Sequence, residues 1–274
     1  MKIIMLIILF LSLSGICNSQ DKVIDTAFLS LNYRYIYKNN LLTPERKEGL
    51  MTLLIGSNWS LFYNKHNDEY YFNRNDIDYS TYVIQSVDEN GTLTRTRTGD
   101  YPRTIGPTEY TYLERIRREE IFIARIPFKG FYYYSQKFNF PNWSIIQQEK
   151  TILGYLCQMA VTNFLGRNWI VWFTMELPIN LGPWKLVGLP GLILEAKDEE
   201  GHFEFIAISL NKPANAELLQ IKMKNDLSVT KTTKDNFFKM QRSVYENDGD
   251  FGPVKFKILT PYQQSKRKLN TIER

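Results

Sequence analysis

Two glutamates, Glu176 and Glu195, are the residues whose type and spacing could support hydrolysis. They fall on neighbouring predicted strands, in a part of the chain that is rich in tryptophan. A glycoside hydrolase requires two carboxyl groups about 5 to 10 Å apart, because one acts as an acid and the other as a base or nucleophile. Both glutamates also have the parity that a half-exposed sheet turns to solvent. A glycan or peptide hydrolase is therefore kept as an alternative function, and no residue is assigned as catalytic.

Thiol chemistry would depend on Cys157. This residue could act as a nucleophile with His202 or His66 as its base. In the alternation of its predicted strand, however, its side chain shares a face with apolar neighbours such as Tyr155 and Met159. A buried cysteine behaves as a small hydrophobic residue. We therefore expect Cys157 to lie in the core.

The chain offers few ligands for a metal or a cofactor. It has two histidines and two cysteines, with neither a C-x-x-C nor an H-E-x-x-H motif. The acidic run at 198–200 could coordinate calcium, but Gly201 directly after it is typical of a hairpin turn. The sequence also has no G-x-S-x-G nucleophile motif and no glycine-rich phosphate loop. We predict no metal site and no cofactor.

Composition indicates a folded, strand-rich protein. Hydrophobic residues make up 43% of the 274 positions, which is enough for a sizeable core and excludes intrinsic disorder as the default. Aromatic residues reach 14%, and such residues favour strands and large apolar interfaces. The net charge of +5 is small and dispersed, so it does not predict binding to nucleic acid.

Period-two alternation of apolar residues predicts the strands that must position these groups. In the segment 169–177, Trp169, Val171 and Phe173 share one parity, while Ile170 and Trp172 are apolar on the other. A segment that is apolar on both faces must be covered on two sides. Further strands are expected over 151–164, 192–197 and 202–210, which together form an antiparallel meander.

Helical periodicity is confined to one late segment. Residues 232–245 place Phe237, Met240 and Val244 at helical spacings after a threonine start, with Asp235 in the first turn. The predicted fold class is therefore mainly β, a β-rich α+β protein. Its core is expected to be a curved antiparallel meander sheet or half-barrel, packed with at least one helix from the C-terminal half.

A hexapeptide at 188–193 is the most distinctive motif. Pro190 fixes its own φ and glycine accepts a positive φ, so Pro190-Gly191 suits the two central positions of a type II turn. A second Gly/Pro element at 182–185 brings Trp184 next to this turn. The hexapeptide consists of Gly188, Leu189, Pro190, Gly191, Leu192 and Ile193.

These motifs resemble the GLPGLI proteins of Bacteroidota, a family named after the same hexapeptide. The resemblance implies an exported protein of the cell envelope, with no catalytic residues defined. It extends from about Trp143 to Leu210, with a weaker match over 50–62. The segments that carry it are 152–157, 166–169, 172–174, 182–185 and 188–193.

The first nineteen residues predict an export signal. Lys2 precedes an apolar run at 3–13 that is too short to span a membrane, and small residues follow it. Acylation of Cys17 is the alternative. We expect a signal peptide at 1–19, a single GLPGLI-type β-rich domain at 20–262 and a polar basic tail at 263–274. The protein is then exported to the periplasm or outer envelope, or secreted, with no transmembrane segment after cleavage.

The sequence favours binding over catalysis. The first hypothesis is a non-enzymatic envelope protein that binds an apolar small molecule or lipid, or an envelope partner protein, and no nucleic acid. A structural accessory subunit without a ligand is the third reading, beside the hydrolase. The expected binding surface consists of Trp169, Trp172, Trp184, Leu189, Pro190 and Gly191.

Overall fold

The computed structural model describes most of the chain between residues 21 and 273. For 82–87 and 93–97 it describes the strands but not the side chains. The predicted export signal, Cys17 and His66 lie outside the described residues, so the predictions made for them are not tested. The described ranges are 21–65, 67–68, 82–87, 93–97, 108–126, 129–213, 219–224, 229–246 and 268–273.

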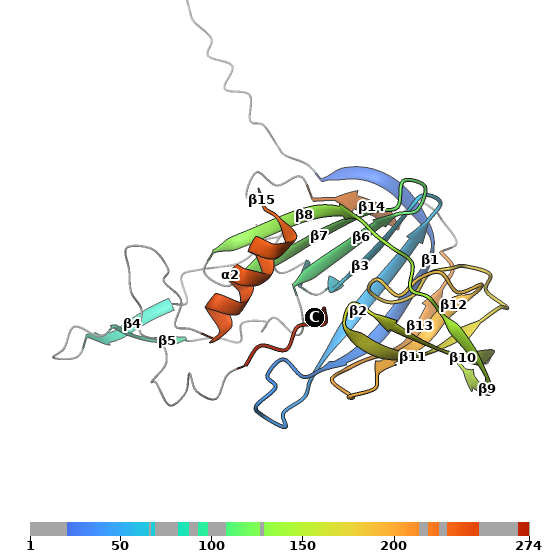
Figure 1. Ribbon diagram of the computed structural model, residues 1–274. Coiled ribbons are helices and arrows are strands. Elements are labelled where there is room, and N and C mark those ends of the chain that lie inside the picture. Colours follow the sequence, from blue (N-terminus) through green and yellow to red (C-terminus); the bar gives the residue numbers. More distant parts are fainter. Residues whose placement is uncertain are drawn as a thin grey trace, which may run out of the picture.

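The described part of the chain is built mainly of strands, with one long helix, α2 (Figure 1). This confirms the predicted fold class. The elements are β1 (Lys22–Tyr37), β2 (Lys47–Gly56), β3 (Trp59–Tyr63), β4 (Tyr82–Val87), β5 (Leu93–Arg97), β6 (Glu109–Glu114), β7 (Glu119–Ile126), β8 (Gly130–Lys137), β9 (Ser144–Ile152), β10 (Tyr155–Phe164), β11 (Arg167–Thr174), β12 (Leu192–Asp198), β13 (Phe203–Asn211), β14 (Gln220–Met223), β15 (Val229–Lys231) and α2 (Lys234–Glu246).

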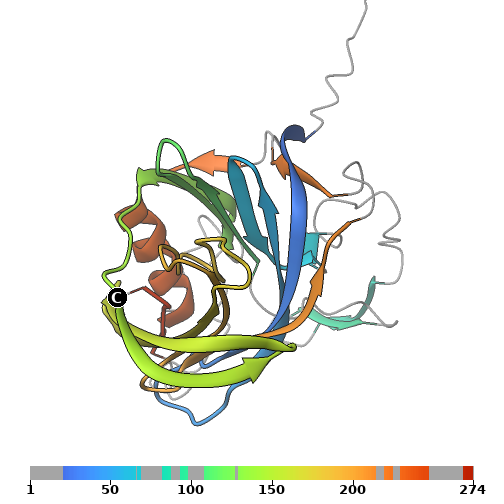
Figure 2. The ribbon, with the colours of Figure 1, turned by 90° about the vertical axis from the view of Figure 1, so that its right-hand side faces the viewer.

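One large open sheet forms the body of the molecule. Its strand order is β15-β8-β7-β6-β3-β2-β1-β13-β12-β11-β10-β9, with β14 paired to β1 outside this path. The strands pair antiparallel except β15, which runs parallel to β8. The sheet curves strongly, and α2 and the C-terminal residues lie on its concave side (Figure 2). The long strand β1 joins the two halves, since it pairs with β2 on one side and β13 on the other.

The predicted meander is present as the consecutive strands β9 to β13. The segment expected as one strand over 151–164 is divided by a two-residue turn, in which Leu153 and Gly154 both have positive φ. A second turn of this kind, at Leu165 and Gly166, joins β10 to β11. Two successive residues with positive φ match the twist of the strands that they connect.

Strand β10 departs from the parity that the sequence predicted, at an irregularity in its pairing with β9. The pairing with β9 shifts between Gln158 and Met159, so Cys157 and Ala160 point inward while Met159 does not. The expected burial of Cys157 is confirmed, because its side chain is 0% exposed within the main core. The expected alternation with Met159 is wrong, because the residues of β10 that point inward change parity between Cys157 and Ala160, where the pairing with β9 is irregular.

Helix α2 begins at Lys234, directly after Thr233 of the predicted threonine signal. The Thr233 hydroxyl accepts a hydrogen bond from the Asn236 N–H at 3.3 Å, which caps the N-terminus. Phe237 is fully buried against Phe122 and Tyr134, with ring centroids 5.5 and 5.8 Å away. The helix therefore packs its apolar face against β7 and β8.

The C-terminal residues also enter the concave side of the sheet (Figure 1). Asn270 and Glu273 are 5% and 6% exposed, and Leu269 forms an isolated bridge with Asn40. We call residues 268–273 the C-terminal strap. The sequence predicted a polar basic tail here. Within this segment, the buried cations Arg167 and Lys185 hold the polar groups of the strap.

The glycines of the hexapeptide have different roles from those predicted. Gly188 has a positive φ of 98°, whereas Gly191 does not fall in that region. A Cβ at Gly191 would lie 2.0 Å from the Thr174 carbonyl oxygen. Gly191 is therefore required by the close approach of two backbone segments and not by the expected type II turn.

Candidate functional site

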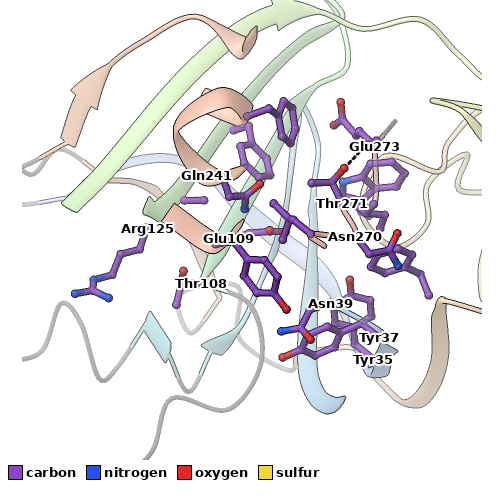
Figure 3. Close-up of a pocket in the computed structure, with 18 of the residues that line it drawn as sticks. Tyr35, Tyr37, Asn39, Thr108, Glu109, Arg125, Gln241, Asn270, Thr271 and Glu273 are labelled. Carbon is purple, nitrogen blue, oxygen red and sulfur yellow. Dashed lines mark hydrogen bonds between the residues drawn. The ribbon is translucent and has the colours of Figure 1, made fainter. Parts of the chain in front are cut away.

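A cavity of about 430 Å³ opens on the concave side of the sheet. Its wall is formed by side chains from β1, β6, β7, β13 and α2, together with Trp184 and the C-terminal strap. Figure 3 shows Tyr35 and Tyr37 at one side and Gln241 of α2 at another. Segments from the start, middle and end of the chain therefore meet at this pocket.

Aromatic rings form much of the wall. Tyr35 and Tyr37 stack with ring centroids 5.0 Å apart and an interplanar angle of 14°. Tyr35 also stacks on Phe205 of the core at 4.6 Å, which fixes the orientation of its ring. Phe203 and Trp184 line the pocket as well. Rigid aromatic faces of this kind bind apolar and amphipathic ligands at low entropic cost.

Glu109 supplies the carboxyl group of the pocket (Figure 3). It is the first residue of β6, and its backbone pairs with Ala124 of β7. Burial raises the pKa of this carboxyl group to about 7, while the nearby Lys185 ammonium opposes the shift. No described side chain forms a hydrogen bond or an ion pair with it. A carboxyl group with a raised pKa in a cavity is a physical indicator of a functional site.

Two further polar atoms at the pocket lack partners. Trp184 Nε1 and Gln241 Oε1 are both buried, and neither has a hydrogen-bond partner in the described structure. Trp184 also has a positive φ of 56°, which is a strained conformation for a bulky residue. Unsatisfied buried polar atoms cost free energy, so their presence around one cavity favours a ligand that completes them.

A buried ion cluster holds the end of the strap beside the pocket. The Lys185 ammonium lies 2.5 Å from Glu120 Oε1, and it also contacts Glu273 of the strap. Glu273 is bound a second time by Lys234 of α2 at 2.6 Å. These two ammonium groups hold the pKa of Glu273 below its usual value, although burial alone would raise it. Lys185 is therefore already engaged by two carboxylates.

Arg167 fixes the rest of the strap. Its guanidinium donates hydrogen bonds to Asn270 Oδ1 and the Thr271 carbonyl oxygen, both at 2.6 Å, and to the Ile272 carbonyl oxygen at 3.0 Å. The same group forms an ion pair with Asp198 at 2.7 Å. The strap wall of the pocket is thus attached to β11 and β12 through one side chain.

A group of potential metal ligands lies next to Arg167. Donor atoms of Asp198, Glu200 and His202 are within 4.8 Å of one another. The Arg167 guanidinium contacts both carboxylates of this group, at 2.7 and 3.4 Å. Two backbone N–H groups also bind Asp198 Oδ1. A positive charge thus already faces these carboxylates, and we assign the group a structural role.

The two predicted catalytic carboxylates have structural partners. Glu195 forms an ion pair with Lys150 at 2.6 Å, and Lys150 lies over the Trp172 ring at 4.4 Å. Glu176 accepts a hydrogen bond from the Leu156 N–H at 2.8 Å. Neither glutamate lines the cavity described above. Hydrolysis by this pair stays a prediction that no contact in the structure supports.

The residues of the predicted binding surface do not form one surface. Trp169, Trp184 and Leu189 are at most 2% exposed and belong to the core. Trp172 is half-buried on the other face of β11, beneath Lys150. Gly191 is buried and Pro190 is exposed. Of this set, Trp184 alone lines the main pocket.

Sequence reasoning missed Glu109, Gln241 and Arg167. Glu109 stands in an alternating segment with Tyr110 and Tyr112, but its role depends on a cavity built by distant strands. Arg167 entered the sequence analysis only within the segment 166–169, which carries the GLPGLI resemblance. A signal was available, because Arg167 directly precedes an apolar strand and an acidic run begins at Asp198 on the next one.

Comparison with known proteins finds a family model that matches the chain. A family model described as "N-glycanase peptide, N-terminal domain" matches residues 63–235, which is more than half of the chain. Glu109, Arg167 and Trp184 lie inside the matched range, whereas Tyr37 and Gln241 lie outside it. No curated protein matches the chain. The resemblance to GLPGLI proteins stays a prediction, since none of these comparisons addresses it.

Two solved structures are similar to the chain. "Structure of PNGF-II in C2 space group" has 17% identity and a TM-score of 0.47, covering 78% of this chain and 32% of that one. "Structure of PNGF-II in P21 space group" has 18% identity and a TM-score of 0.45, covering 77% and 32%. The chain therefore spans about a third of the length of these solved chains.

The structure was also searched for membrane-spanning helices. Among the described residues, none of the helices has the length and apolar character needed to cross a bilayer.

Proposed function

We propose, since the chain belongs to the family of N-glycanase peptide N-terminal domains, that it is an exported saccharide-binding domain. It holds a glycan in the pocket between Glu109, Trp184 and Gln241 and does not itself cleave it. The export signal that the sequence predicts at 1–19 supports the proposed location outside the cytoplasm, where glycoproteins and envelope glycans are found.

The single observation that carries this proposal is the pairing of aromatic faces with unpartnered polar atoms in one cavity. A sugar ring has an apolar face that packs on an aromatic ring, and its hydroxyl groups both donate and accept hydrogen bonds. Trp184 Nε1 lacks an acceptor and Gln241 Oε1 lacks a donor. A polyhydroxylated ligand can supply both.

The same observation separates a saccharide from the purely apolar ligand that the sequence suggested. A lipid chain would pack against Tyr37 and Phe203, but it would leave the buried Trp184 and Gln241 polar atoms unsatisfied. Burial of an unpaired polar group is unfavourable by about 1 to 3 kcal/mol for each group. The pocket therefore favours an amphipathic ligand.

Isothermal titration calorimetry on the mature chain tests the proposal. The probes are N,N′-diacetylchitobiose and lactose as saccharides, and palmitate as the apolar ligand. We expect a saccharide to bind and Gln241→Leu to weaken its binding about fivefold or more, because one hydrogen bond is lost. Gln148→Leu, on the exposed surface of β9, makes the same chemical change outside the pocket and leaves binding unchanged.

Other results would decide against a saccharide. Binding of palmitate without either disaccharide would support the apolar-ligand hypothesis. If a broad glycan array also shows no binding, the proposal fails, and an envelope partner protein becomes the hypothesis to test by crosslinking. Release of a smaller glycan from the array during incubation would contradict the non-catalytic part of the proposal.

A further inference from the structure

Two hydrogen-bond acceptors enter the pocket without a donor. Figure 3 shows the Glu109 and Gln241 side chains directed into the cavity, one from β6 and one from α2. Gln241 Oε1 is buried and unpartnered, and no described side chain donates to the Glu109 carboxylate. Together they provide acceptors on two sides of one space.

The cations near Glu109 are directed elsewhere. Lys185 is held by Glu120 at 2.5 Å and by Glu273, so two carboxylates share its charge. Arg125 lines the same pocket, but Figure 3 shows its guanidinium pointing away from Glu109. The Glu109 carboxylate thus faces the cavity without a contacting counter-charge in the described structure.

Aromatic faces border the same space. Tyr37 stacks on Tyr35 and lines the pocket, and Tyr245 of α2 lines the same pocket. The face of an aromatic ring carries partial negative charge and attracts cations. A protonated amine is recognised by a carboxylate, an amide oxygen and aromatic faces, and this pocket offers all three.

We infer that the pocket binds an ammonium group, placed between Glu109 and Gln241 and carried by an amino sugar. The inference rests on the proposed function, because the sugar ring is what packs on the aromatic wall. The ammonium donates hydrogen bonds to the Glu109 carboxylate and to Gln241 Oε1. It supplies both the donors and the positive charge that this side of the cavity lacks.

Binding of an ammonium group requires Glu109 in its ionised form. The charged and titratable groups that act on it are Lys185 and Glu273, with the hydroxyl groups of Tyr35 and Tyr37 nearby. Arg125 and Tyr245 line the same pocket, and the Arg125 guanidinium points away from Glu109. Glu109 is the group among them that titrates near neutral pH. The bound cation stabilises the carboxylate, so binding at neutral pH releases a proton from Glu109.

The test compares glucosamine, N-acetylglucosamine and glucose, which differ at one ring position. Calorimetry on the whole chain at neutral pH is expected to show glucosamine binding about tenfold or more tightly than glucose. Glu109→Gln removes the negative charge, and it is expected to abolish this preference by lowering the affinity for glucosamine to about that for glucose. Glu149→Gln, on the exposed surface of β9, is the matched control and keeps the preference.

A second readout separates this inference from the proposed function. Methylammonium chloride is titrated while the carboxyl carbon of Glu109 is followed by ¹³C NMR, and the Glu109 signal is expected to move toward the ionised form.

If neutral sugars bind but the three sugars bind equally, or the preference survives Glu109→Gln, the inference is overturned and the proposed function stands. If methylammonium shifts Glu109 but no sugar binds, the ammonium site is supported and the saccharide proposal fails. If neither glucosamine nor methylammonium affects Glu109, the inference is overturned.

Discussion

The Arg167 guanidinium lies 2.7 Å from the Asp198 carboxylate in the interior, and both side chains are 1% exposed. The same guanidinium binds three groups of the C-terminal strap. One buried ion pair therefore connects two strands of the meander to a wall of the candidate pocket.

Replacing Arg167 should strongly destabilise the protein. Arg167→Met leaves Asp198 charged and buried and removes the attachment of the strap, so we expect a loss of about 3 to 5 kcal/mol in the free energy of unfolding. Arg46→Met is the matched control, because Arg46 pairs with Glu204 at 3.2 Å while 42% exposed. That change should cost less than about 1 kcal/mol. Equal urea midpoints for the two variants would contradict a structural role for the buried pair.

Glu109 should make stability depend on pH around neutrality. Its pKa is raised from 4.5 to about 7, so the folded state holds the proton more tightly than the unfolded state. The stability that Glu109 contributes is fully present when the pH is below 4.5, the pKa of this group in the unfolded chain. It is lost as the pH rises through about 7, the pKa in the folded protein. Glu109→Gln should match the wild type near pH 4 and be more stable by about 2 to 3 kcal/mol at alkaline pH. Urea unfolding at a series of pH values measures this, and parallel curves for the two proteins would disprove the shift.

Two tryptophans of the predicted surface should respond differently to truncation. Trp184 is buried, with its ring 5.7 Å from Trp169, so Trp184→Ala should lower the free energy of unfolding by about 3 to 5 kcal/mol. Trp172 is half-buried under Lys150, and Trp172→Ala should lower it by about 1 kcal/mol or less. Thermal melts of both variants decide the point. Similar losses would mean that Trp172 also belongs to the core.

Cys157 should be unreactive in the folded protein. Burial raises the pKa of its thiol to about 11, so little thiolate forms near pH 8, and the side chain is 0% exposed. Iodoacetamide should therefore modify it only after unfolding in urea, as measured by intact mass. Rapid alkylation of the native protein would contradict this placement.

Gly191 should not tolerate a side chain. Gly191→Ala would place a methyl group 2.0 Å from the Thr174 carbonyl oxygen, and overpacking of this kind costs about 1 to 3 kcal/mol or more. Gly154→Ala tests the other cause of glycine preference, because Gly154 has a φ of 84° and open space around it. Its cost should be about 1 to 2 kcal/mol from the left-handed backbone alone. A larger loss in Gly154→Ala than in Gly191→Ala would refute the steric explanation.

Local patterns predicted the meander well. Strands β9 to β13 follow one another in the sheet, and the alternation of Trp169, Val171 and Phe173 is set by packing within this unit. The signals that predicted the helix are also local, since its threonine cap and the apolar residues around Phe237 are close together in sequence. Such elements are determined by residues that are close together in sequence, so a single sequence is sufficient to predict them.

The candidate site could not be found in this way. Glu109 gains its raised pKa from burial among elements that come from both ends of the chain. Strand β10 changes which of its residues point inward near Gln158 and Met159, where its pairing with β9 is irregular. The alternation of apolar residues in the sequence does not show such an irregularity. Gln241 was predicted to be helical, but its unpartnered oxygen depends on how α2 packs beside the strap. These features follow from long-range pairing.

The strap also sets the order in which the chain can fold. Arg167 binds Asn270, which lies 103 positions later in the chain, and Lys185 binds Glu273, which lies 88 positions later. During synthesis both cations are made well before these partners, so the concave side cannot close while the last segment is still missing. The pocket wall that the strap forms can therefore assemble only after residues 268–273 have been made.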